Sequence, residues 1–295
     1  YNVGHQHFLA LGENMGVFDA VHLKLVLGLM AVLPIFIVSN VVGLGIEFYF
    51  ASKKGHPIEE GYLVTGALIP LIMPPDIPLW MLSLSIIFAV VLAKEAFGGT
   101  GMNIVNVALM ARAFIFFAYP TEISGDSPWV TAIDFEKSLT EYSFLHTMFN
   151  PLFDMMGWST FVGGQPLLET FTGATPLAMA RAGGWESITA VYSPTAMFVG
   201  GIPGCIGETS KLAILFGMGF LLVTGVASWR IMLSMALGVM VTGMLFNAWG
   251  LYIYMDIPWY NHFLMGGLLF AMALMATDPV TACGTDTGKW IYGFF

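Results

Sequence analysis

The feature that most constrains this chain is a series of long apolar stretches that carry almost no charge. Residues 25–46 contain no Asp, Glu, Lys or Arg, and about 20 apolar residues are enough to cross the hydrocarbon core of a bilayer. Charged residues make up only 10% of the chain, against about 25% in a soluble domain. A chain of this composition would expose large apolar patches to water, so an ordinary soluble enzyme and a disordered chain are both excluded.

We therefore predict an all-α polytopic membrane protein, a bundle of transmembrane helices in which residues 1–295 form one integral membrane domain. Asp76-Ile77-Pro78 and Asp256-Ile257-Pro258 each precede an apolar stretch, and this short echo predicts two repeated halves. Tyr1 and the apolar end of the chain indicate a piece of a longer protein. The predicted transmembrane segments are residues 25–46, 61–75, 77–93, 102–121, 212–228, 231–255 and 257–277, with another beginning at residue 291.

A polar, acidic region rich in Gly and Pro separates the two groups of apolar stretches, at residues 120–208. It is too long for a simple turn, and long loops usually carry function or are disordered. Lys and Arg in the short loops favour one face by five to two, which predicts that this long loop is extracytoplasmic.

The charge and the metal-binding residue types exclude several kinds of site. The net charge is −9 and no basic run is present, so the sequence gives no reason to expect nucleic acid as a partner. Two cysteines and six scattered histidines do not form a metal-ligand pattern, so we predict no protein metal centre. No side chain is assigned a catalytic role, and no GxGxxG motif in a strand–helix context indicates an NADH site.

Ionisable residues in or beside the apolar stretches are the first candidates for function, because intramembrane charge is costly. These residues are Glu47, Lys94, Glu95, Arg112 and Asp278. The carboxylates suit Na⁺ or protons, whereas the alternative is a set of interfacial or structural ion pairs.

A glycine-rich turn at residues 98–101 precedes Asn103 and Asn106, whose spacing of three places both amides on one face of a helix. Two such amides can bind a flat heterocycle, or they can form a hydrogen bond between helices. The spacing alone favours the second interpretation.

The segment Thr172-Gly173-Ala174-Thr175 lies in the predicted extracytoplasmic loop. It resembles the [ST]-G-A-T motif in which FMN is esterified to a threonine through a phosphoester bond. The two small residues leave room for the phosphate beside the Thr175 hydroxyl.

Further blocks resemble the family of the B subunit of the Na⁺-translocating NADH:quinone oxidoreductase, in the same order along the chain. The related D subunit of the Rnf complex shares the flavin motif but matches less well at Lys94-Glu95 and at residues 114–120. The shared blocks include Lys94-Glu95-x-Phe97-Gly98-Gly99-Thr100-Gly101-x-Asn103, Arg112-Ala113-Phe114, Ile202-Pro203-Gly204-x-Ile206-Gly207-Glu208, Ala227-Ser228-Trp229-Arg230, Thr277-Asp278-Pro279 and Gly288-Lys289-Trp290.

The resemblance implies a set of sites. Covalent FMN maps to Thr175, beside Gly173 and Ala174, and a noncovalent riboflavin is placed near Asn103 and Asn106. Gly43-Leu44 departs from the two adjacent glycines of the family at the quinone site, and residues 127–165 resemble an insertion. The implied quinone residues are Gly43, Glu47 and Phe88, and the implied Na⁺ pathway residues are Glu47, Glu95 and Asp278.

The resemblance also implies the assembly: a redox pump in the bacterial inner membrane, with ubiquinone or menaquinone as electron acceptor. Electrons would enter from a periplasmic FMN subunit, and an NADH-oxidising FAD/iron–sulfur subunit would supply them. Two alternatives stay open, an Rnf-type D subunit that passes electrons between ferredoxin and NAD, and a cofactor-free channel or transporter.

Overall fold

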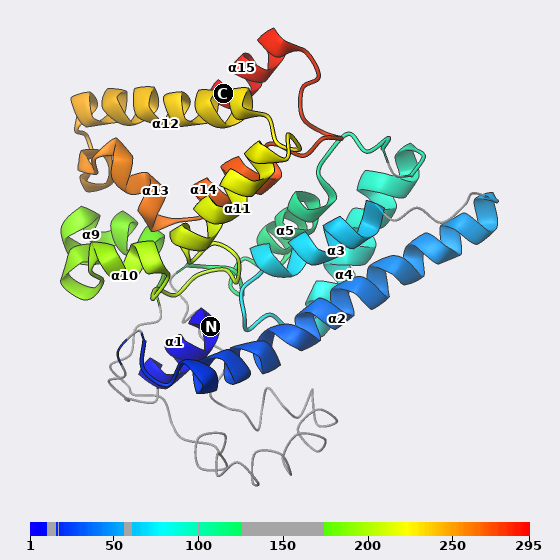
Figure 1. Cartoon of the computed structure of the whole chain (residues 1–295), viewed down its shortest axis with the longest axis horizontal. Helices are drawn as coiled ribbons and strands as arrows, with labels where there is room; N and C mark the ends of the chain where they lie inside the picture. Colours follow the sequence, from blue (N-terminus) through cyan, green and yellow to red (C-terminus); the bar gives the residue numbers. More distant parts are fainter. Residues whose placement is uncertain (11–15, 17, 56–60, 100, 126–173) are drawn as a thin grey trace, which may run out of the picture.

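The computed structural model describes residues 1–10, 16, 18–55, 61–99, 101–125 and 174–295, and the secondary structure of this part of the chain is entirely helical (Figure 1). The predicted insertion at residues 127–165 and Gly173 lie outside the described residues. The helices are α1 (Asn2–Ala10), α2 (Val21–Lys54), α3 (Gly61–Ile72), α4 (Leu79–Ala89), η1 (Val90–Lys94), η2 (Glu95–Phe97), α5 (Val107–Ala118), α9 (Pro176–Val191), α10 (Pro194–Val199), α11 (Lys211–Val223), α12 (Trp229–Trp249), η3 (Ile253–Asp256), η4 (Trp259–Asn261), α13 (His262–Met265), α14 (Leu268–Phe270), η5 (Ala271–Met275) and α15 (Asp286–Phe294).

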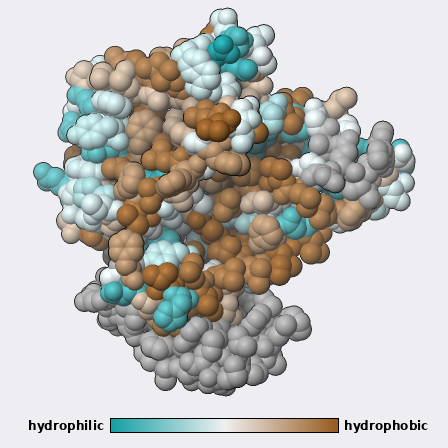
Figure 2. Space-filling view, viewed as in Figure 1, coloured by the Kyte–Doolittle hydropathy of each residue, from teal (hydrophilic) through white to brown (hydrophobic). Residues whose placement is uncertain are grey.

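Three helices of the described part are long and apolar enough to cross a membrane: α2, α12 and the continuous stretch of α4, η1 and η2. Helices α3, α5 and α11 are shorter and also apolar. Large apolar side chains on these helices point outward, and Phe117 and Val223 are 81% and 88% exposed. The face in Figure 2 is hydrophobic over much of its centre. The prediction of an all-α polytopic membrane protein is confirmed.

The helices pack as two groups of neighbours. In the first, α2 packs against α3 and α4, and α5 packs against α3 and α4; in the second, α12 packs against α15. The α12–α15 contact is close because glycines stand where the two backbones meet: a Cβ on Gly293 would lie 2.6 Å from the carbonyl oxygen of Ile231. Small residues allow this approach between membrane helices.

The short sequence echo corresponds to a repeated order of structural features. Pro78 and Pro258 both stand just before a helical segment, with similar extended ψ angles of 130° and 136°. Each segment then includes a π-helical turn, η1 in the first and η5 in the second. After each turn comes a helix with a side-chain N-cap, Asn106 for α5 and Thr285 for α15. This common order supports two repeated halves.

Two of the predicted apolar ranges differ from the helices that form. In residues 102–121 the helix extends only over α5, because Gly101 has a φ of +87° and the chain becomes helical only after the Asn106 cap. Residues 257–277 form several short helices rather than one. The break lies at Gly266, where the backbone is extended, and the carbonyl of this residue accepts a hydrogen bond from Lys211 instead of continuing a helix.

Candidate functional site

Thr175 is the residue immediately before α9 and caps the N-terminus of that helix. Its Oγ1 accepts a hydrogen bond from the backbone N–H of Ala178 at 3.3 Å, and its own N–H donates to the carbonyl of Gly125 at 3.1 Å. Pro176 follows in the first helical position, which its fixed φ suits. A phosphate on this hydroxyl would lie at the positive end of the helix dipole, the position that most favours an anion.

A cavity of about 570 Å³ opens beside Thr175. Arg112, Arg181 and Glu208 contribute charged groups to its wall, and Phe270 contributes an aromatic ring. The two arginines complement an anionic group, and the apolar lining suits an aromatic ring system. The charge of the cavity wall and the volume of the cavity beside Thr175 therefore suit a phosphorylated aromatic cofactor.

Arg112, which the sequence marks only as an intramembrane charge, joins the inner wall of this cavity. Its guanidinium donates to the carbonyl oxygen of Ile72 and, at 2.8 Å, to the Sγ of Cys205. Glu208 accepts from the N–H of Cys205 at 3.1 Å through Oε1. Through Arg112, α5 is thus bonded to two chain segments: the end of α3 at Ile72 and the segment around Cys205 that precedes α11.

The same two segments also bind each other through their backbones, and Lys211 links the one that contains Glu208 to the chain at Gly266. The N–H of Gly207 donates to the carbonyl of Leu71 at 2.7 Å. The fully buried Lys211 ammonium donates to the carbonyls of Glu208 and Gly266, at 2.6 and 2.8 Å. Glu208 and Lys211 were not among the predicted site residues. The available signals were the position of Glu208 as the last residue of a shared motif block and a lysine at the start of an apolar helix.

Asn106 and Asp278, predicted for different roles, lie in contact. The Asn106 side-chain amide donates to Asp278 Oδ2 at 3.1 Å, while its Oδ1 caps α5 by accepting from the N–H of Leu109. Thr281 donates to the same Asp278 oxygen at 2.7 Å. Asn103 lies before α5 in non-helical chain, so the prediction that both asparagines share one helix face is wrong. The glycine-rich turn delays the helix start.

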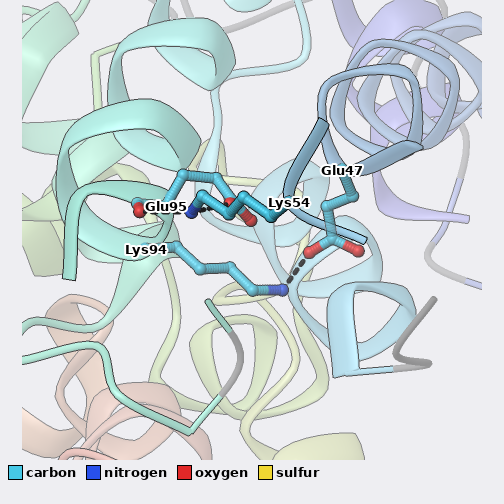
Figure 3. A network of polar contacts seen from close by, with 4 residues as sticks. All are labelled: Glu47, Lys54, Lys94 and Glu95. Carbon is cyan, nitrogen blue, oxygen red and sulfur yellow. Dashed lines mark hydrogen bonds and ion pairs between the residues drawn. The ribbon is translucent and has the colours of Figure 1, made fainter. Parts of the chain in front are cut away.

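Glu47 and Lys94 form a buried ion pair between α2 and η1 (Figure 3). Their side chains are 7% and 4% exposed. Beside it, Lys54 binds the carboxylate of Glu95 at 3.0 Å and its carbonyl at 2.9 Å, with the Lys54 side chain 34% exposed. Two of the three predicted ion-pathway carboxylates, Glu47 and Glu95, are therefore each paired with a lysine in the same region of the structure (Figure 3).

Tyr62 packs against the same pair and explains the glycine at position 43. A Cβ on Gly43 would overlap the ring of Tyr62, which is fully buried. The Tyr62 hydroxyl donates to the carbonyl of Ser39 at 3.0 Å, and Lys94 Nζ lies 5.7 Å from the ring centroid.

Phe88, the third predicted quinone residue, lies on α4 and packs against Phe114 of α5, with 4.6 Å between ring centroids. The structure thus places Gly43 and Glu47 in one site with Lys94 and Tyr62. The family resemblance groups Phe88 with these residues, but the ring contact of Phe88 in the structure is with Phe114 of α5.

The model of the NQR2, RnfD, RnfE family matches residues 3–295. The chain belongs to this family. Its relatives include proteins named as the B subunit of a Na(+)-translocating NADH-quinone reductase. The one from Chromohalobacter salexigens is 41% identical over 100% of this chain and 67% of its own length. One from Pseudomonas aeruginosa is 40% identical over 99% and 69%. One from Klebsiella pneumoniae is 42% identical over 90% and 58%. The predicted family is confirmed.

The contact between Asn106 and Asp278 can be tested by substitution. Asn106→Ala is expected to lower the free energy of unfolding by about 1–2 kcal/mol, because it removes a helix N-cap and the amide partner of Asp278. Asn106→Ser is the matched control, since serine keeps the cap and cannot reach Asp278. Thermal unfolding of the detergent-solubilised protein measures both. A Ser variant as stable as the wild type would mean that the link to Asp278 contributes nothing.

Proposed function

We propose that this chain is the membrane flavoprotein subunit of a Na⁺-pumping NADH:quinone reductase, with FMN attached to Thr175. The observation that carries the proposal is the Thr175 hydroxyl, which caps α9 at the edge of a cavity lined by Arg112 and Arg181. The [ST]-G-A-T sequence around it and relatives named as the B subunit of such a reductase point to the same activity.

The other predicted sites complete the proposal. Riboflavin is assigned to the region of Asn103 and Asn106, and quinone to that of Gly43, Glu47 and Phe88. Electrons would pass from FMN through riboflavin to ubiquinone or menaquinone. A flavin supplies both one- and two-electron transfer, which suits a junction between single-electron carriers and a quinone. Na⁺ would pass by Glu47, Glu95 and Asp278.

The residues of the chain have separate tasks in this scheme. Thr175 holds the phosphate at the N-terminus of α9, and Arg112 and Arg181 offset the negative charge of the cofactor. The contact between Asn106 and Asp278 places a residue of the proposed riboflavin region on a proposed ion-pathway carboxylate. A change of charge at Asp278 would therefore act at short range on a flavin bound beside Asn106.

The proposed surroundings are a bacterial inner membrane and a multi-subunit complex. A periplasmic FMN subunit would donate electrons to Thr175-bound FMN, and an FAD/iron–sulfur subunit would oxidise NADH. In this arrangement the three long apolar helices lie in the bilayer, and the loop that carries Thr175 faces the periplasm.

The test is ultraviolet fluorescence of the denatured subunit from its native host, followed by mass spectrometry of the peptide that covers residues 165–185. A fluorescent band with FMN on Thr175 supports the proposal. Unmodified Thr175 would contradict it and favour a cofactor-free transporter. Na⁺-dependent quinone reduction by the whole complex then separates this function from that of an Rnf-type D subunit, since the model of this family covers both.

A further inference from the structure

The buried ion pair of Glu47 and Lys94 is neutral as a whole, and this neutrality is what allows it to lie in the interior. Both side chains are almost inaccessible, at 7% and 4% exposed. An uncompensated charge at such a position in a membrane protein is strongly unfavourable, so the Glu47 carboxylate needs a cation beside it. In the structure that cation is the Lys94 ammonium, as Figure 3 shows.

Tyr62, on α3, packs beside this ion pair. The Tyr62 hydroxyl donates to the carbonyl of Ser39, on the same helix as Glu47, at 3.0 Å. The Glu47 carboxylate itself is a ligand of the kind that hard cations such as Na⁺ prefer. The ring of Tyr62 also faces the ammonium of Lys94, at 5.7 Å, so the lysine has a second favourable contact besides Glu47.

Lys94 is placed on an irregular segment. It is the last residue of the π-helical turn η1, after which the chain continues into the 3-10 turn η2. Its carbonyl accepts a hydrogen bond from Gly99 at 3.1 Å, which closes the glycine-rich turn. Single π-helical turns are rare within α-helices and occur frequently at functional sites.

We infer that Lys94 is a built-in competitor of Na⁺: its ammonium occupies, on the Glu47 carboxylate, the position that the transported cation takes. One positive charge replaces another, so Na⁺ binds to Glu47 when the ammonium moves off it. Lys94 thereby sets how tightly Na⁺ is held at this point of the pathway. The inference rests on the proposed role of Glu47 in Na⁺ passage and adds Lys94 as the residue that governs it.

The experiment uses the whole complex purified from its native host with Lys94→Met in this chain. A ligand that binds only the native state raises its stability as its concentration rises. The measurement is the temperature at which half of the complex is lost from size-exclusion profiles, in NaCl and in choline chloride of equal ionic strength. We expect Na⁺ to stabilise Lys94→Met specifically, with half of the effect reached at about tenfold lower Na⁺ concentration than in the wild type.

Two further variants serve as controls. Glu47→Gln combined with Lys94→Met has neither charge, and we expect the additional stabilisation by Na⁺ that Lys94→Met shows over the wild type to disappear. Lys94→Arg keeps a cation on Glu47, and its response to Na⁺ should stay at the wild-type level. Since Na⁺ replaces the ammonium in this scheme, Lys94→Met complex should also assemble better in cells grown at high Na⁺ concentration.

Three results would overturn the inference: no specific stabilisation of Lys94→Met by Na⁺, an equal stabilisation of the double variant, or failure of Lys94→Met to assemble at any Na⁺ concentration. Any of these in a complex that carries FMN on Thr175 and reduces quinone in a Na⁺-dependent manner leaves the proposed function intact. Absence of FMN and of Na⁺ dependence from the wild-type complex instead contradicts the proposed function itself.

Discussion

Thr175→Ala is expected to abolish the ultraviolet fluorescence of the denatured subunit and to lower quinone reduction by the whole complex at least about 100-fold, because the attached cofactor carries the chemistry. The same change removes the hydroxyl that accepts the N–H of Ala178, so the protein also loses about 1 kcal/mol of stability from the α9 N-cap. In-gel fluorescence, NADH-driven quinone reduction and thermal unfolding measure the three effects.

Thr175→Asn separates attachment from capping. Asparagine is as good an N-cap as threonine but has no hydroxyl to esterify. We expect this variant to keep the stability of the wild type and to lose the fluorescence and the activity. Thr172→Ala is the second control and should leave all three measurements unchanged, because the other threonine of the motif is not the proposed attachment site. Fluorescence that persists in Thr175→Asn and disappears in Thr172→Ala would move the attachment site to Thr172.

The parts of the fold that the sequence predicts well are those determined over short distances. The hydropathy of residues 25–46 is sufficient to predict the core of α2. Pro78 and Pro258 fix φ and mark the starts of related segments in both halves. The break in residues 257–277 was not predicted, because it depends on a contact between distant segments: the Gly266 carbonyl is satisfied by Lys211, 55 positions earlier.

The candidate sites divide in the same way. The Thr175 motif is a continuous run, and its capping partner Ala178 is three residues away. The pairing of Glu47 with Lys94 joins residues 47 positions apart, and that of Asn106 with Asp278 joins residues 172 positions apart. A single sequence marks each of these side chains as unusual, but their partners follow from how the helices pack.

The central link made by Arg112 depends most strongly on such packing, and its removal is expected to have the largest effect on stability. Arg112→Met removes two hydrogen bonds from a charged donor, to the carbonyl of Ile72 and to the Sγ of Cys205. Hydrogen bonds to charged groups contribute about 1.5–3 kcal/mol each, so we expect a loss of at least about 3 kcal/mol. For a chain of this size that corresponds to a decrease of roughly 6 °C in the unfolding midpoint.

Arg230→Met is the matched control, because Arg230 also pairs through Nη1, but with the exposed carboxylate of Asp286. Exposed pairs contribute at most about 1 kcal/mol, so this variant should unfold within roughly 2 °C of the wild type. Arg112→Lys should lie between the two, since an ammonium keeps the charge but lacks the planar fork that reaches both acceptors. Midpoints that do not differ between Arg112→Met and Arg230→Met would show that the two interior segments are held by their backbone bonds alone. If instead the predicted order is found, Arg112 holds together the inner wall of the cavity beside Thr175, so variants of this residue should loosen the bound flavin as well as the fold.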